Sequence, residues 1–209
     1  MKQMKFIAFG DSLTYGYGVL EPVAYPARLT RELPKKSQGI QWEIRNCGIN
    51  GDTSREAPFR MEQNLIRFRP QIAAVLLGSN DSALNEGQYR TLWEFKKNMT
   101  RIIERIFAAE HDDPDFNNGH CLPLLITPPP VVDTDFFPFT TTDRIEAYRD
   151  AVLELAKRYG CPVIDLFAVF MEKKAQGSAE DYEDLFQFDG IHLSDAGYDV
   201  LYPPIRKRR

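Results

Sequence analysis

The sequence predicts an α/β protein built on one parallel sheet of about five strands. Short apolar runs recur along the chain at 5–10, 42–46, 71–77, 122–127 and 162–166. Segments with helical periodicity lie between them, and strands that alternate with helices form a parallel sheet covered on both faces. No linker or internal repeat divides the 209 residues, so we expect a single domain over residues 1–209.

Two helices are predicted from apolar stripes at three- and four-residue spacing. The first stripe is formed by Leu92, Phe95, Met99, Ile102, Ile103, Ile106 and Phe107. The second is formed by Ile145, Tyr148, Val152, Leu155 and Ala156. Gly160 and Pro162 follow the second stripe and are typical of a helix end.

Two long loops are expected, at 111–120 and 127–142. The second follows the fourth expected strand, so we expect it to lie over the crevice at that end of the sheet. Loops of this length in a compact domain are usually functional or mobile.

The charge balance gives no sign of a nucleic-acid partner. Lys and Arg total 26 against 30 Asp and Glu, for a net charge of −4, whereas nucleic-acid binders usually carry a basic excess. The basic end at 206–209 is compatible with a localisation signal or an anionic-surface patch. We favour the end of a last helix, where cations interact well with the helix dipole.

The apolar stretch before Asp11 is too short for a signal-peptide core, and no apolar run reaches membrane-spanning length. We therefore expect a cytoplasmic protein without a membrane span. Three cysteines, Cys47, Cys121 and Cys161, do not form a disulfide framework and are expected to be reduced, small, buried side chains.

Four short segments place polar or glycine residues where chemistry is expected. They are Gly10-Asp11-Ser12-Leu13, Asn46-Cys47-Gly48-Ile49-Asn50-Gly51, Gly78-Ser79-Asn80-Asp81 and Asp189-Gly190-Ile191-His192-Leu193. The first three follow expected strands, and the C-terminal ends of neighbouring parallel strands open onto one crevice. We therefore expect these three to converge.

Ser12 is the candidate nucleophile. A serine hydroxyl becomes reactive when an adjacent base takes its proton, so Ser12 requires a histidine within reach. Its backbone N–H, just past a strand, can also face a developing negative charge. The alternative is that Ser12 only caps a helix.

His192 is the candidate base among three histidines. The other two, His111 and His120, lie in a polar loop, where we expect them to be exposed.

Asp189 precedes His192 by three residues. This spacing allows the carboxylate to accept from one ring nitrogen while the other faces Ser12. The alternative is an ordinary helix start, with Ser194 as N-cap and Asp189 in a turn before Gly190.

Gly51 and Asn80 are candidate oxyanion donors. Asn80 offers a side-chain NH₂ group, and Gly51 offers a backbone N–H that no Cβ obstructs. Alternatively, Asn50-Gly51 is a common turn and 78–81 is a loop at a strand exit.

The four segments, in this order, resemble the signature blocks of the SGNH hydrolases, also called GDSL esterases and lipases. They span residues 10 to 193, nearly the whole chain. The resemblance implies a three-layer α/β/α sandwich with a flavodoxin-like parallel sheet. It gives Ser12 the role of nucleophile and oxyanion donor, and Asp189 and His192 the rest of the triad. By the same match, Gly51 and Asn80 resemble the other oxyanion donors.

Two further patterns point to different branches of this family. The stretch 9–18, with 25–29 and 51–54, is similar to bacterial arylesterases and thioesterases. The stretches 80–84 and 126–128 are similar to esterases of short-chain acetate esters. The subfamily therefore stays open.

Substrate contacts are expected from Asp11, Phe136 and Phe137. Phe136, Phe137 and Phe139 belong to the loop over the crevice. They line an acyl or alcohol pocket or, alternatively, anchor the loop to the core.

No metal or cofactor is expected. Gly16-Tyr17-Gly18 lacks the third glycine of a dinucleotide site. The stretch His111-Asp112-Asp113 with Asp115 has metal-binding side chains, but an acidic solvated loop is the favoured interpretation.

The sequence therefore predicts a serine esterase that acts on small-molecule acyl esters, with its oligomeric state left open. The enzymatic alternatives are an acyl-CoA thioesterase or a lysophospholipase that uses the same residues. The alternative from another class is a non-catalytic, flavodoxin-like ligand-binding module.

Overall fold

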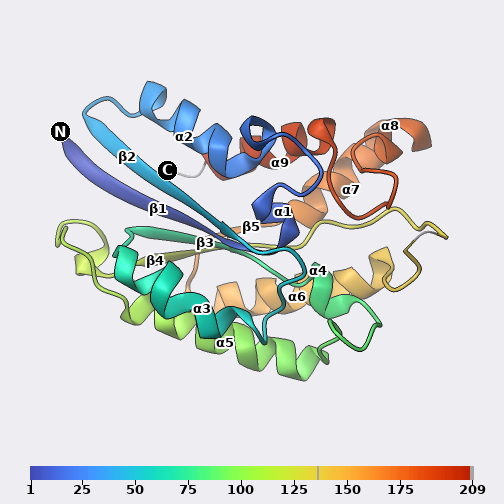
Figure 1. The fold of residues 1–209 in the computed structure, drawn as a ribbon, viewed down its shortest axis with the longest axis horizontal. Coiled ribbons are helices and arrows are strands. Elements are labelled where there is room, and N and C mark those ends of the chain that lie inside the picture. Colours follow the sequence, from blue (N-terminus) through green and yellow to red (C-terminus); the bar gives the residue numbers. More distant parts are fainter. Residues whose placement is uncertain (136, 208–209) are drawn as a thin grey trace.

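A central parallel sheet organises the computed structural model, which describes residues 1–135 and 137–207, with side chains to residue 203. Its strands are β1 (Lys2–Gly10), β2 (Ile40–Gly48), β3 (Ile72–Leu76), β4 (Leu122–Ile126) and β5 (Val163–Ile164). They lie in the order β2-β1-β3-β4-β5, and every neighbouring pair is parallel. The five expected strands are confirmed, and Figure 1 shows their arrangement.

Helices cover both faces of the sheet, which gives the expected three layers (Figure 1). One layer contains α1 (Ser12–Tyr15), α2 (Tyr25–Lys36), α7 (Leu166–Gln176), α8 (Ala179–Glu183) and α9 (Asp195–Lys207). The other contains α3 (Ala57–Asn64), α5 (Leu92–Ala108) and α6 (Thr142–Tyr159), with α4 (Ser79–Ser82) at the strand ends. Short 3₁₀ turns lie at Glu21–Val23, Ile66–Phe68 and Asn117–Gly119.

The central strands are buried on both faces because their side chains alternate between two cores. In β1, Ile7 and Phe9 pack with the helices of the α3, α5 and α6 layer. Phe6 and Ala8 pack with the opposite layer.

The two helices predicted from apolar stripes are α5 and α6. Thr91 begins α5 by accepting the Glu94 amide at 3.2 Å, and Thr141 caps α6 through the Arg144 amide. Gly160 ends α6 with a φ of 66°, a conformation that glycine adopts at little cost.

Strand β5 is shorter than the expected 162–166. The carboxylate of Asp165 accepts the Ala168 amide at 3.1 Å, so α7 begins directly after it. Because Asp165 caps α7, β5 ends at Ile164 and not at the expected residue 166.

The C-terminal residues form the expected last helix. Arg206 and Lys207 lie at the end of α9, and residues 208–209 lie outside the described residues. Among the described residues, no helix is both long and apolar enough to span a membrane. Cys121 and Cys161 are buried, Cys47 is half-buried, and all three are free thiols.

Candidate active site

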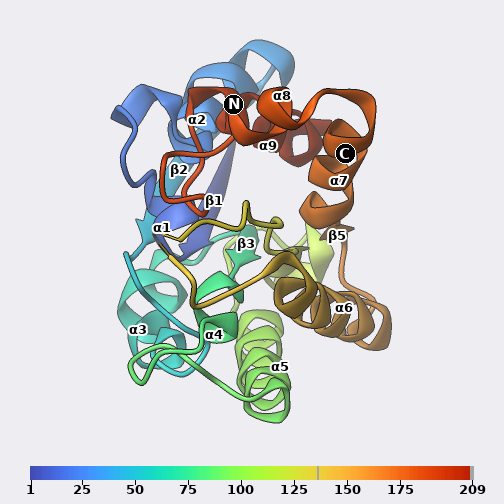
Figure 2. The same ribbon diagram turned by 90° about the vertical axis from the view of Figure 1, so that its right-hand side faces the viewer.

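The segments that follow β1, β2 and β3 converge at the C-terminal edge of the sheet, as predicted. Figure 2 views the molecule from this side, with α1 and α4 next to the strand ends. A cavity of about 170 Å³ lies among these segments. It is lined by Ser12, Tyr17, Asn50, Gly51, Ser79, Asn80, Ala83, Gln88, Phe137, Thr140, Ile191 and His192.

Ser12 is the first residue of α1 and is 6% exposed. The cap of this helix is Asp11, whose carboxylate accepts the Leu13 amide at 2.9 Å. Ser12 therefore does not cap this helix, which was the alternative interpretation of its position. Its Oγ lies 3.0 Å from Nε2 of His192, although 180 residues separate the two in sequence.

Asp189 holds the other ring nitrogen of His192, with 2.6 Å between Oδ2 and Nδ1. Its second oxygen accepts the backbone amides of Ile191 and His192, both at 2.9 Å. Burial raises the pKa of the Asp189 carboxyl, but these hydrogen bonds outweigh burial and keep the pKa below its usual value. Since an ionised carboxylate only accepts, Nδ1 carries the proton and Nε2 presents its lone pair to Ser12.

A turn at Gly190 fixes Asp189 against the loop after β4. Gly190 has a φ of 74°, and an added Cβ would lie 2.3 Å from the Val132 carbonyl oxygen. The Val132 amide donates to the Gly190 carbonyl at 2.9 Å, and the Thr134 hydroxyl donates to the Asp189 carbonyl at 3.2 Å. Ser194 nevertheless caps α9 by accepting the Gly197 amide, so this segment both starts a helix and supplies the imidazole.

Three N–H donors lie around the cavity. Within 1–135 and 137–207, neither the Ser12 amide nor the Gly51 amide donates to a protein acceptor. Gly51 has a φ of 76°, a conformation rare for other residues. Asn80 donates one side-chain N–H to the Asp52 carbonyl at 2.9 Å, which leaves its second N–H for the cavity.

Asp52 and Arg60 connect the Gly51 loop to the strand ends. The Arg60 guanidinium contacts the Asp52 carboxylate at 2.5 Å and donates to the carbonyls of Cys47 and Gly10 at 2.7 and 2.9 Å. Burial raises the pKa of the Asp52 carboxyl, and the Arg60 charge opposes that rise. This contact holds the ends of β1 and β2 next to the candidate donors.

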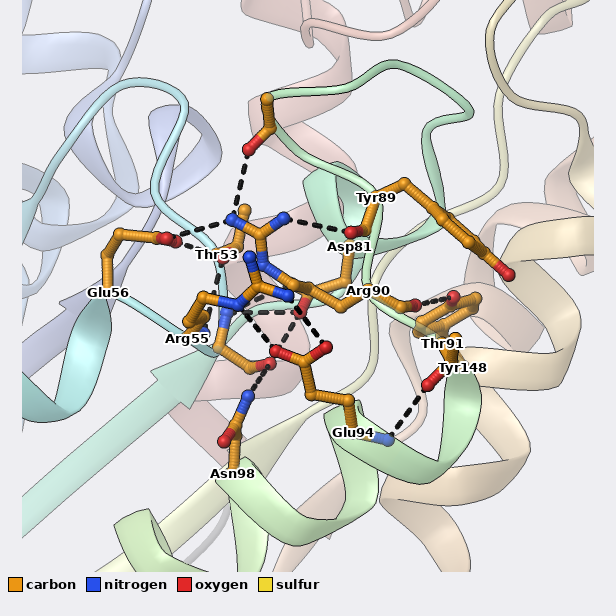
Figure 3. Close-up of polar contacts among 12 residues, drawn as sticks. Thr53, Arg55, Glu56, Asp81, Tyr89, Arg90, Thr91, Glu94, Asn98 and Tyr148 are labelled. Carbon is orange, nitrogen blue, oxygen red and sulfur yellow. Dashed lines mark hydrogen bonds and ion pairs between the residues drawn. The ribbon is translucent and has the colours of Figure 1, made fainter.

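A second polar network joins the Gly51 loop to the loop of Asn80 (Figure 3). Buried Asp81 accepts the backbone and hydroxyl groups of Ser54, the latter at 2.5 Å. Buried Arg90 contacts Glu56 at 2.8 Å and donates to the carbonyls of Gly87 and Tyr89. The network fixes the position of the Gly51 loop relative to the loop of Asn80.

Tyr17 and Gln187 were not anticipated from the sequence. The Tyr17 ring lies 4.4 Å from the His192 ring, centroid to centroid, at an interplanar angle of 40°. The side-chain amide of Gln187 donates to the carbonyls of Tyr17 and Leu193 at 2.8 and 3.0 Å. The only sequence signal was the flanking pair Gly16 and Gly18, both of which have positive φ here.

Of the expected substrate contacts, Phe137 lines the cavity and Asp11 does not. Asp11 is 1% exposed because its carboxylate turns inward to cap α1. Phe136 lies outside the described residues. Phe139 is 41% exposed and packs edge-on against Phe137.

The prediction that His111 is exposed was wrong, whereas His120 is exposed. The His111 ring is buried between the His120 carbonyl, 3.1 Å from Nε2, and the Asp113 amide, which donates to Nδ1. Asp112 pairs with Arg69, and Asp113 pairs with Lys2. These acidic side chains therefore serve contacts within the fold.

The model of the GDSL-like Lipase/Acylhydrolase family matches residues 8–200. Thioesterase 1/protease 1/lysophospholipase L1 of Escherichia coli strain K12 is 25% identical over 89% of this chain and 74% of its own length. The acetylxylan esterase of Xylanibacter ruminicola is 24% identical over 93% of this chain and 40% of its own length.

The fold is also similar to that of a solved relative. The lipase/acylhydrolase from Enterococcus faecalis superposes with a TM-score of 0.79 at 25% identity, covering 97% of this chain and 93% of that one.

Proposed function

Because the chain belongs to the GDSL-like lipase/acylhydrolase family, we propose that it hydrolyses small acyl esters with Ser12 as nucleophile. In this proposal His192 is the general base, and Asp189 holds it in the productive tautomer. The observation that carries the proposal is the 3.0 Å contact between Ser12 Oγ and His192 Nε2. Nucleophile, base and orienting carboxylate then form the chain of hydrogen bonds that serine hydrolysis requires.

In the first half of the reaction, Ser12 Oγ attacks the ester carbonyl carbon while its proton passes to His192 Nε2. The carbonyl oxygen becomes an oxyanion, which the Ser12 and Gly51 amides and the second Asn80 N–H stabilise. The intermediate collapses, the bond to the alcohol oxygen breaks, and the leaving alcohol takes the proton back from His192. The product at this stage is an acyl-Ser12 enzyme.

In the second half, water attacks the acyl carbon while His192 takes one of its protons. The same donors stabilise the second oxyanion, and Ser12 recovers its proton from His192 as the carboxylic acid leaves. The charge on Asp189 stabilises the imidazolium in both halves.

The size of the cavity supports a short acyl group. Its volume of about 170 Å³ is below the roughly 300–1,000 Å³ typical of pockets for drug-sized ligands. Ala83, Phe137 and Ile191 give it an apolar side suited to an acyl chain. The similarity to an acetylxylan esterase also supports a short acyl group.

The second candidate function is thioester or lysophospholipid hydrolysis on the same residues. The Escherichia coli relative, named as a thioesterase and lysophospholipase, supports it. Rates on p-nitrophenyl and CoA esters of increasing chain length distinguish the two. A maximum at two to four carbons, with a preference for oxygen esters, is the result expected here.

A fluorophosphonate probe tests the reactive serine directly. We expect stoichiometric labelling of the wild type, none in Ser12→Ala, and a turnover loss of at least roughly 10⁴-fold in that variant. Ser79→Ala is the matched control: Ser79 lines the same cavity, and labelling should persist. A folded wild type that is neither labelled nor active on activated esters would instead indicate a ligand-binding module.

A further inference from the structure

The orientation of the Asn80 side-chain amide determines whether it can act as an oxyanion donor. A side-chain amide has nearly the same shape when its nitrogen and oxygen are exchanged, but only the NH₂ group stabilises an oxyanion. With the oxygen facing the cavity, Asn80 would repel the developing charge. The protein therefore needs contacts that distinguish the two orientations.

The first such contact is the carbonyl of Asp52. It accepts from Asn80 Nδ2 at 2.9 Å, and a backbone carbonyl cannot act as a donor. This fixes the nitrogen on the Asp52 side. The oxygen of Asn80 accepts from Nε2 of Gln88, also at 2.9 Å.

Gln88 has the same ambiguity, because its side chain also ends in an amide. Its oxygen accepts from Asn85 Nδ2 at 2.7 Å, which places the nitrogen toward Asn80. Asn85 is oriented in turn, because its side-chain oxygen accepts the backbone N–H of Gln88 at 2.9 Å. A backbone N–H cannot act as an acceptor.

The three amides thus form a relay, Asn85–Gln88–Asn80, that begins at a backbone donor and ends at a backbone acceptor. Each hydrogen bond determines the orientation of the next amide. Turning any one amide around would place two donors or two acceptors against each other. We propose that Gln88 is a positioning residue that, aligned by Asn85, holds the NH₂ group of Asn80 toward the oxyanion. This inference rests on the proposed function.

The direct test reverses the relay at Gln88. Gln88→Glu removes the donor and opposes an acceptor to the Asn80 oxygen, so we expect kcat to fall roughly 10- to 100-fold. That loss is below the roughly 10²–10³-fold expected for Asn80→Ala. Gln88→Met removes the donor without adding charge and should cost only a few-fold in kcat. KM should change little in either variant, because the oxyanion forms only in the transition state.

A second variant reverses the relay from outside the cavity. Asn85→Asp still accepts the Gln88 amide but has no N–H, so Gln88 turns its nitrogen outward and its oxygen toward Asn80. We expect kcat to fall, but by less than in Gln88→Glu. Glu86→Gln changes the charge of the same loop without touching the relay and should retain wild-type kcat.

A double-mutant cycle separates positioning from a general structural or charge effect. In the Asn80→Ala background, Gln88→Glu and Asn85→Asp should cause no further loss, because there is no amide left to orient. An undiminished loss in that background, or wild-type kcat in both single variants, overturns the inference. If Asn80→Ala itself retains full activity, the oxyanion assignment in the proposed function fails instead. Thermal unfolding of each variant confirms that it is folded.

Discussion

Two buried aspartates next to the cavity respond to their surroundings in opposite ways. Hydrogen bonds keep the pKa of Asp189 below its usual value despite burial. Burial raises the pKa of Asp11 to about 7, with the nearby charges of Asp81 and Asp52 adding to the rise. Asp189 is therefore suited to carry a permanent charge next to an imidazole. Asp11 lies beneath the cavity, and its Oδ2 is buried and has no hydrogen-bond partner among the described residues.

The pH profile of kcat/KM should show an acidic limb. Because hydrogen bonds keep its pKa low, Asp189 remains ionised on mild acidification and continues to orient His192. A protonated His192 cannot accept from Ser12, so activity falls as the pH decreases. Initial rates on an activated ester between pH 4 and 9 check this. A profile that is flat down to about pH 4 would contradict the role of His192.

Single residues also show which part of the candidate site was predictable. Ser12, Gly51 and Asn80 follow strands, and the ends of parallel strands meet, so their convergence followed from position alone. Gln88, Gln187 and Tyr17 act through contacts that no local pattern encodes. Their side chains are also typical of exposed loops, so nothing in the sequence separated them from ordinary surface residues.

Among the secondary-structure elements, the segment before α9 depends on a contact with the turn after α1. Gln187 makes this contact, because the Tyr17 and Leu193 carbonyls share the two N–H donors of its side-chain amide. Gly18 lies against the Gln187 amide, where an added Cβ would lie 2.2 Å from Oε1, and its φ of 77° also favours glycine. Gln187 thus links the segment that carries Ser12 to the segment that carries His192.

Gln187→Met should weaken this connection and lower both stability and turnover. It removes two hydrogen bonds, one of them exposed, and each typically contributes about 0.5–1.5 kcal/mol to the free energy of unfolding. Looser alignment of His192 should lower kcat by roughly tenfold. Urea unfolding and kcat measurements check both effects, with Gln176→Met on the exposed end of α7 as the control. Wild-type kcat in a folded Gln187→Met protein would show that the contact does not position the histidine.

The helices differed in how far the sequence revealed them. Clear apolar stripes predicted α5 and α6 because one side of each helix packs on the sheet. Helix α2 contains Pro34, which usually indicates an interruption, and α7 begins with Leu-Phe-Ala-Val-Phe, which has no polar face. Both are stabilised by packing against other elements, and a local pattern cannot show such packing.

At the scale of the whole molecule, stability should depend on the buried carboxyls under the cavity. Burial raises the pKa of Asp81 to about 7 as well, despite its hydrogen bonds from Ser54. Between about pH 4 and 7 the folded protein retains protons on Asp11 and Asp81 that the unfolded chain releases. Their contribution to stability is therefore complete at low pH and is lost as the pH rises through about 7.

Asp11→Asn should reduce this dependence. The asparagine oxygen can still accept the Leu13 amide, but no charge is buried above neutral pH. Relative to the wild type, the variant should be more stable at pH 8 than at pH 5, by at most about 3 kcal/mol in the free energy of unfolding. Urea unfolding at both pH values measures the difference, and Asp115→Asn provides the same change at an exposed position. An equal pH dependence in wild type and Asp11→Asn would contradict the raised pKa.

The separation of Ser12 and His192 by 180 residues has a consequence for biosynthesis. A nascent chain that has emerged as far as α8 already contains the hydroxyl, the glycine turn and the asparagine, but it lacks the imidazole. On the proposed mechanism, such a chain is inert toward cellular esters while it is still on the ribosome. Hydrolytic capacity then arises only once the last segment has been translated and has closed on the first.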